Sequence, residues 1–220
     1  MQRKWWMAMG LVLAAGVAQA GSVRTDDAAV YKPTGKGWGE LDNSPGAAAR
    51  AGLARSKSGG NGINYNGGPV LTNPAGNTVY YICYGSWGGN TATAILPALA
   101  GSIAPSPYFN INTTYYDAKS NHVANQITYG GSTTDSYSQG AALSDAGVQA
   151  VVSSAISSGR LPASQDAVYF VLTSADVNET SGFCTQYCGW HTHGTIGGKD
   201  IKYAFVGNPD RCPSACEDQT

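Results

Sequence analysis

The chain has 220 residues, of which only 12% are charged, and its formal net charge is −1 at pH 7. This balance excludes the basic surface that binding to nucleic acid or anionic lipid would require. The length suits one domain with a tail, and the 29 glycines and 13 tyrosines favour a loop-rich fold typical of exported proteins.

The first twenty residues (1–20) have the pattern of a secretory signal peptide. Arg3 and Lys4 form a basic start, and the apolar stretch 5–17 that follows is too short to span a bilayer. Residues 18–20 have the small-x-small pattern, which predicts cleavage between Ala20 and Gly21. A retained membrane anchor is the alternative, but nothing apolar continues past residue 20. We therefore expect a secreted or extracellular protein, with the periplasm or the cell wall as its alternative locations and no integral membrane segment after cleavage.

Residues 21–64 contain few large apolar side chains and much Gly, Ala, Ser and Lys. Such a segment cannot bury enough surface to offset the entropy lost on ordering, so we expect a mostly disordered, flexible N-terminal segment. Order is predicted to begin near Tyr65, and the domain is predicted to occupy 65–220.

The first strand of this domain is predicted over 79–84, where aromatic and β-branched residues precede Gly85. Cys83 lies within it and is expected to be a buried free thiol. Residues 91–101 suggest a short helix, which Pro97 should limit to its first turn or kink.

Further strands are predicted over 108–116 and 126–129. A helix should begin after Ser144, a good N-cap, because the apolar residues that follow have helical spacing. Gly159 and Pro162 follow in the order that ends a helix.

The run 167–173 is almost continuously apolar, as in a central strand buried on both faces, and 201–206 is a last short strand. This order of elements predicts one α/β or α+β domain, with a mixed sheet packed by two or so helices and with disulfide-stapled loops.

The cysteines form two pairs with the same spacing, Cys184 with Cys188 and Cys212 with Cys216. In an exported chain this pattern favours disulfides over a structural zinc. The sequence does not choose among the three pairings that four cysteines allow.

Two phosphate-binding or catalytic signatures fail on inspection. Residues 194–199 resemble a phosphate-binding loop, but the glycine spacing is too short and Asp200 replaces the hydroxyl residue. Residues 85–88 are not a nucleophile elbow, because Tyr84 occupies the position of the first glycine.

Four ordered blocks resemble the phosphate-induced protein 1 family, also called the exordium-like family. They are 65–72, 79–87, 135–140 and a long block from 168 that continues through Cys184, Cys188-Gly189-Trp190-His191 and Val206-Gly207-Asn208 to Cys212-Pro213. Cys83 departs from the family pattern, which has tryptophan there. Family members continue well past the second cysteine pair and include a His-Glu-Leu-x-Glu helix, whereas this chain ends at Thr220. We therefore expect a fragment, a truncated gene model or a short variant that lacks the family's C-terminal part.

The resemblance and the residues themselves lead to three functional hypotheses. The favoured one is a non-catalytic extracellular or cell-surface protein. The second is a zinc-metallopeptidase-like hydrolase, in which His191 or His193 would join zinc ligands from a downstream His-Glu helix. No cofactor is predicted for the chain as it stands, zinc being conditional on that motif, and catalytic activity is not expected.

The third hypothesis is a glycan-binding module with cell-wall or extracellular polysaccharide as its partner. Tyr84, Trp87, Tyr187 and Trp190 could stack on sugar rings, although packing against the sheet is the favoured role for these residues.

Overall fold

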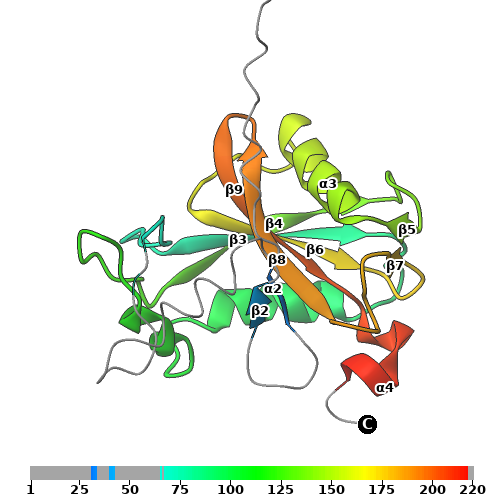
Figure 1. Cartoon of the computed structure of the whole chain (residues 1–220), viewed down its shortest axis with the longest axis horizontal. Coiled ribbons are helices and arrows are strands. Elements are labelled where there is room, and N and C mark those ends of the chain that lie inside the picture. Colours follow the sequence, from blue (N-terminus) through cyan, green and yellow to red (C-terminus); the bar gives the residue numbers. More distant parts are fainter. Residues whose placement is uncertain (1–30, 34–39, 43–64, 66, 218–220) are drawn as a thin grey trace, which may run out of the picture.

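The computed structural model describes residues 31–33, 40–42, 65 and 67–217. Their centre is a mixed sheet with the strand order β2-β1-β8-β9-β6-β3-β4 (Figure 1). The strands are β1 (Tyr31–Pro33), β2 (Glu40–Asp42), β3 (Asn77–Tyr84), β4 (Ile127–Asp135), β6 (Ala167–Thr173), β8 (Gly189–Ile196) and β9 (Lys199–Val206). Strands β9, β6, β3 and β4 are parallel, whereas β8, β1 and β2 add an antiparallel side. The predicted single mixed α/β domain is therefore confirmed.

Two helices cover opposite faces of the parallel part, α2 (Ala92–Ser102) and α3 (Asp145–Ser157) (Figure 1). The chain leaves β3 through α2 to reach β4, then returns through α3 past β3 to β6. Right-handed crossovers that run in opposite directions place their helices on opposite faces. Successive side chains of β3 point to opposite faces of the sheet. Tyr80 and Ile82 belong to the core under α3, whereas Val79 and Tyr81 belong to the core beside α2.

Helix α3 begins as predicted. The Ser144 hydroxyl accepts a hydrogen bond of 3.0 Å from the Gly147 amide, which satisfies one of the free amides at the helix start. The valines of one face, Val148, Val151 and Val152, are fully buried against the sheet. Helix α3 therefore gains most of its stability from this packed apolar face.

Helix α2 nearly coincides with the predicted range 91–101, and it continues through Pro97 to Ser102 instead of ending after its first turn. Proline removes one hydrogen bond of the helix interior. Packing offsets this loss: Leu96 and Ala100 contact the core that includes Tyr81, and the Tyr81 hydroxyl donates to the Leu96 carbonyl at 3.2 Å.

The predicted strand over 108–116 is wrong, since Phe109–Thr114 form a 3₁₀ helix, η1. Its polar side chains bond to nearby backbone carbonyls, as Asn112 does to Phe109 and Thr113 does to Asn110. Such local bonds compete with a strand ladder, and they explain the turn conformation.

The structure contains more strand than the sequence predicts, in two places. Strand β4 runs from Ile127 to Asp135, beyond the predicted 126–129, and β8 occupies a segment for which no strand was predicted. Strands β8 and β9 form a hairpin whose turn, Gly197-Gly198, has positive φ angles of 59° and 73°. This turn accounts for two of the glycines that resemble a phosphate-binding loop, whereas Gly194 lies within β8.

Two disulfides join Cys184 to Cys212 and Cys188 to Cys216, so the two pairs cross-link to each other. The first pair lies on the loop before β8. In the second pair, Cys212 follows η2 (Pro209–Arg211) and precedes α4 (Pro213–Cys216), and Cys216 is the last residue of α4. Cys83 is a buried free thiol, as expected. This pairing is one of the three that the sequence left open.

The cysteine loop also packs closely on the segment between β9 and the second cysteine pair. Phe183 lies over Gly207, where an added Cβ would come within 2.2 Å of the phenyl ring. The Gly207 amide donates to the Cys188 carbonyl at 3.2 Å. Both contacts place the loop against the residues that follow β9.

Most of the N-terminal predictions lie outside the described residues. The signal peptide over 1–20, with its cleavage site between Ala20 and Gly21, is among them. Within 21–64 the structure describes only β1 and β2, where Tyr31 pairs with His191 of β8. These two short strands do not test the predicted disorder of the segment 21–64, which stays a prediction. In the part of the chain that the structure describes, no helix is long and apolar enough to cross a bilayer.

Candidate functional site

The four parallel strands end at one edge of the sheet, where polar residues follow each strand. The connection after β3 leads to α2 on one face, whereas the segment after β6 packs into the core under α3 on the other face. Neighbouring parallel strands whose connections diverge in this way leave a crevice between their carboxyl ends, the usual ligand site of open α/β sheets. In this protein the crevice lies between β3 and β6.

A close backbone approach joins these two strand ends. Gly85 follows β3 with a φ of +98°, and a Cβ at this position would lie 2.0 Å from the Ser174 hydroxyl oxygen. The same oxygen accepts a hydrogen bond of 3.0 Å from the Ser86 amide. Only glycine fits here, because a side chain would both strain the backbone and displace Ser174.

Asp176 is held at this edge by two hydroxyl groups. Ser174 Oγ and Tyr137 Oη each donate to the Asp176 carboxylate at 2.5 Å. The hydrogen bond from Ser174, followed by that from Tyr137, lowers the pKa of Asp176, with a smaller contribution from the charge of Arg211. Tyr137 has a φ of 57°, unusual for a side chain of this size. Asp176 is therefore a fixed, ionised hydrogen-bond acceptor.

A cavity of about 530 Å³ opens beside Asp176. We name this cavity the carboxyl-edge crevice. Its walls come from the segments after β3, β6 and β9. They are formed by Ser86, Gly88, Gly89, Asn90, Ala175, Asp176, Asn208 and Asp210. This site could not be predicted from the sequence, because its residues are isolated polar positions that only the strand order brings together. One signal was present, because the blocks 79–87 and 135–140 and the block that starts at 168 all include residues at this edge.

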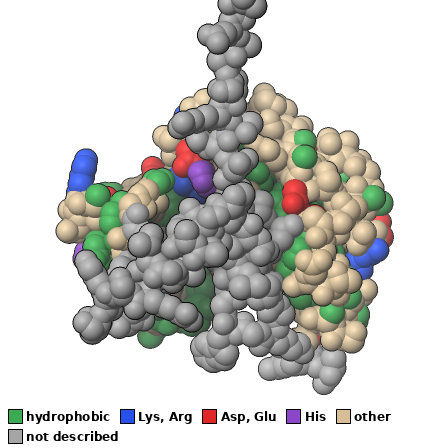
Figure 2. All heavy atoms as spheres, in the orientation of Figure 1, with side chains coloured by type: hydrophobic (Ala, Val, Ile, Leu, Met, Phe, Trp, Pro, Cys, Tyr) green, Lys and Arg blue, Asp and Glu red, His purple; other side chains and the backbone are tan. Residues whose placement is uncertain are grey.

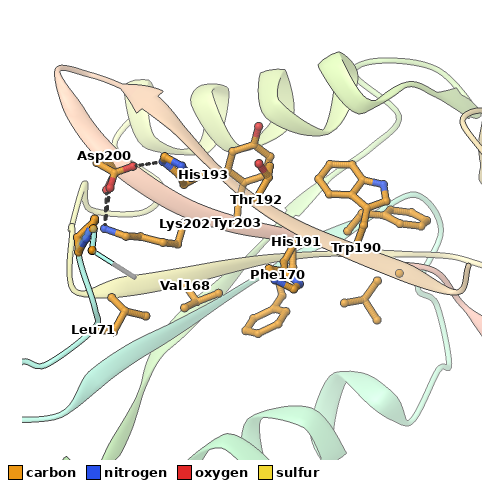
Figure 3. A pocket seen from close by; sticks show the side chains of 17 residues that line it. Leu71, Val168, Phe170, Trp190, His191, Thr192, His193, Asp200, Lys202 and Tyr203 are labelled. Atoms are coloured by element: carbon orange, nitrogen blue, oxygen red, sulfur yellow. Dashed lines mark hydrogen bonds and ion pairs between the residues drawn. The ribbon is translucent and has the colours of Figure 1, made fainter. Parts of the chain in front are cut away.

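A second cavity, of about 850 Å³, lies on the same face of the sheet as α2, over strands that this helix does not cover (Figure 3). We name this cavity the sheet groove. Val168 and Phe170 of β6, with Ala204 of β9, line it, and Pro69 and Leu71 add to the lining. On the face shown in Figure 2, acidic, basic and histidine side chains lie next to one another near the centre.

Three charged or polar side chains lie at one end of the sheet groove (Figure 3). His193 Nδ1 lies 2.7 Å from Asp200 Oδ1, and Lys202 Nζ lies 3.1 Å from Asp200 Oδ2. Burial raises the pKa of Asp200, but the hydrogen bonds from His193 and Lys202 outweigh it, so that the pKa lies below its ordinary value. His193 and Lys202 are direct cross-strand partners of the β8–β9 hairpin, which explains why these groups meet.

His191 and His193 lie on the same face of β8, two residues apart, and both line the sheet groove. A histidine bonded to a carboxylate through one nitrogen can bind a metal through the other. However, among the described residues no three His, Cys, Asp or Glu side chains are placed to hold a metal ion. The described residues therefore do not fit a zinc site, and the four cysteines are used in the disulfides.

The aromatic residues of the glycan hypothesis are mostly packed in the core. Tyr84, Tyr187 and Trp190 expose 0%, 4% and 3% of their surface, so they offer no ring for stacking. Trp87 is half-buried, donates from Nε1 to the Tyr84 carbonyl at 3.0 Å, and packs against the α2-side core. Stacking on sugars is therefore wrong for three of the four residues.

A buried acidic cluster lies where the segment after β6 meets the start of α3. Glu179, in the short strand β7 (Asn178–Glu179) that pairs with β5 (Ala142–Leu143), is 1% exposed. Its carboxylate bonds to the hydroxyls of Ser181 and Tyr187, and Ser181 Oγ also lies 2.7 Å from Asp145 Oδ1. Burial, followed by the interaction with Asp145, raises the pKa of Glu179. Burial and the bond to Glu179 raise the pKa of Tyr187.

A mixed sheet between two helices, with two disulfides beside the carboxyl edge of its strands, defines a disulfide-stapled α/β domain. Residues 63–217 match the family model described as the phosphate-induced protein 1 conserved region. The chain therefore belongs to the phosphate-induced protein 1, or exordium-like, family.

Two curated relatives from Arabidopsis thaliana agree with this assignment. Protein EXORDIUM-like 5 is 32% identical over 166 residues, which cover 70% of this chain and 45% of the relative. Protein EXORDIUM-like 3 is 32% identical over 167 residues, which cover 70% of this chain and 49% of the relative. The chain thus spans about half the length of the curated relatives it matches. No solved structure matches it.

Proposed function

We propose that this chain is an exported exordium-like protein that acts outside the cytoplasm, at the cell surface, in the cell wall or in the surrounding medium. The observation that carries the proposal is the pair of disulfides between the 184–188 loop and the 212–216 segment. Disulfides persist in oxidising compartments and are rare in the cytosol. The signal-type pattern over 1–20 supports the same location.

The proposed role is binding rather than catalysis by these residues. The cysteines are cross-linked, and His193 is held by Asp200 in a cross-strand pair, so these groups have structural partners. The proposed partner is a cell-wall or extracellular polysaccharide. The low charge of the chain is compatible with a neutral polymer.

The proposed location is tested by expressing the full chain with a C-terminal tag in a Gram-negative bacterial host. We expect the tag in the periplasmic fraction, and N-terminal sequencing should start at Gly21. Alkylation without reductant, followed by mass spectrometry, should modify Cys83 alone after unfolding. A matched control without residues 2–20 should remain in the cytoplasm. A cytoplasmic protein with an intact N-terminus and five alkylated cysteines would contradict the proposal.

A further inference from the structure

The carboxyl-edge crevice carries hydrogen-bond donors that are fixed in place. Asn90 Oδ1 accepts the Ala92 amide at 2.9 Å, and Asn208 Oδ1 accepts the Asp210 amide at 2.9 Å. Because each amide oxygen is bonded to the backbone, the group that each asparagine offers to a ligand is its NH₂ donor. Both residues line the cavity, one after β3 and the other after β9.

The same cavity carries fixed acceptors. Asp176 is oriented by the Ser174 and Tyr137 hydroxyls, yet each carboxylate oxygen keeps a lone pair for a further donor. Asp210 adds a second carboxylate to the wall, and the hydroxyl of Ser86 can both donate and accept.

This combination selects among ligand classes. Two carboxylates disfavour an anion, and two NH₂ donors disfavour a bare cation, which needs oxygen ligands. The wall contains Asp, Asn, Ser, Gly and one Ala, so it offers no large apolar side chain to a hydrophobic ligand. A hydroxyl group, by contrast, donates to a carboxylate while it accepts from an amide.

We propose that the carboxyl-edge crevice binds a neutral, hydroxyl-rich saccharide, with Asp176 as acceptor and with Asn90 and Asn208 as donors. The inference rests on the polysaccharide partner proposed above, and it places that partner's site at the strand ends.

The site is tested by titrating the ¹⁵N-labelled mature protein with cellohexaose, xylohexaose and maltohexaose at millimolar concentrations. With at least one of these sugars, we expect the amide signals of Ser86, Asn90 and Asn208 to shift. Asp176→Asn should weaken binding by about tenfold, because a hydrogen bond to a charged acceptor is stronger than one to a neutral acceptor. Asn208→Ala, which leaves the Tyr137–Asp176 contact intact, should weaken binding as well. Asp166→Asn, an exposed carboxylate before β6, is the matched control and should bind like the unmodified protein.

Three outcomes would overturn the inference. One is the absence of shifts with all three sugars. Another is a set of shifts at the crevice with Ca²⁺ but not with sugars. The third is a set of sugar-induced shifts confined to the exposed tyrosines Tyr108, Tyr115 and Tyr116, which would keep a saccharide partner but remove the crevice. None of these outcomes bears on export, which the fractionation tests separately.

Discussion

Single residues at the carboxyl edge determine how closely β3 and β6 approach. Gly85 combines a φ of +98° with a position where a Cβ would overlap the Ser174 hydroxyl. Gly85→Ala should therefore lower the free energy of unfolding by about 2–4 kcal/mol through backbone strain and steric overlap. Urea denaturation measures the change. Gly88→Ala is the matched control, because its φ is not in the positive range and nothing lies within 4 Å of the added Cβ. Equal stability of the two variants would contradict the assigned conformation.

Glu179 makes stability depend on pH. Its pKa in the folded protein is raised above the ordinary value of 4.5, so the folded state binds the proton more tightly than the unfolded state. The resulting stabilisation is complete below pH 4.5 and is lost as the pH rises through the raised pKa. Glu179→Gln cannot titrate, so the stability of this variant relative to the unmodified protein should increase from pH 4.5 upward.

Thermal unfolding across this pH range measures the difference, with Asp166→Asn as the control carboxyl. The lowered pKa values of Asp176 and Asp200 act in another window, because the stabilisation they give is present above 3.8 and is lost below it. Stability curves of Glu179→Gln and the unmodified protein that run parallel above pH 4.5 would rule out the raised pKa.

At the scale of elements, the start of α3 depends on one hydroxyl. Ser144→Ala removes the acceptor of the Gly147 amide and should cost about 1 kcal/mol, measured by urea denaturation. Ser157→Ala, at the exposed last residue of the same helix, should change the stability little. A loss of the same size in both variants would contradict the capping role of Ser144, because alanine has the higher helix propensity.

Elements with a clean hydrophobic period could be predicted from the sequence, and the others could not. Helix α3 has apolar residues at helical spacing, and β6 is an apolar run with a buried environment. Strand β8 also alternates, with Trp190 and Thr192 buried and His191 and His193 exposed, but its polar residues and neighbouring cysteines hid the pattern. Segment 109–114 was misread because local side-chain bonds determine its shape, and such bonds leave no periodic signal.

At the scale of the whole molecule, the site was less predictable than the fold. Ser86, Asp176 and Asn208 are far apart in the sequence and have no common motif. They meet because β3, β6 and β9 are parallel neighbours, which is a property of the strand order. The return of the chain from β4 to β6 therefore creates a site that no local sequence pattern predicts.

The two disulfides should stabilise the protein non-additively. Each disulfide joins residues 28 positions apart, and the two closed segments overlap. When one disulfide is already formed, the other closes only a short ring of about eight residues, made of the two cysteine segments. The loop-entropy relation then gives about 2.5 kcal/mol for loss of one disulfide and about 6 kcal/mol for loss of both. Urea denaturation of C184S/C212S, C188S/C216S and the quadruple variant tests this. A quadruple variant no less stable than either double variant would contradict it.

The packing of Phe183 over Gly207 links the crevice wall to the oxidation state of the cysteine loop. Gly207 precedes Asn208 of the crevice wall and bonds to the Cys188 carbonyl, so the oxidised cysteine loop supports that wall. A newly made chain in a reducing cytoplasm has not yet formed the disulfides. With the proposed export and the proposed saccharide site, we expect binding only after the chain has crossed the membrane. Reductant added to the mature protein should lower this proposed affinity before the sheet unfolds, because disulfide formation would then be the step that completes the site.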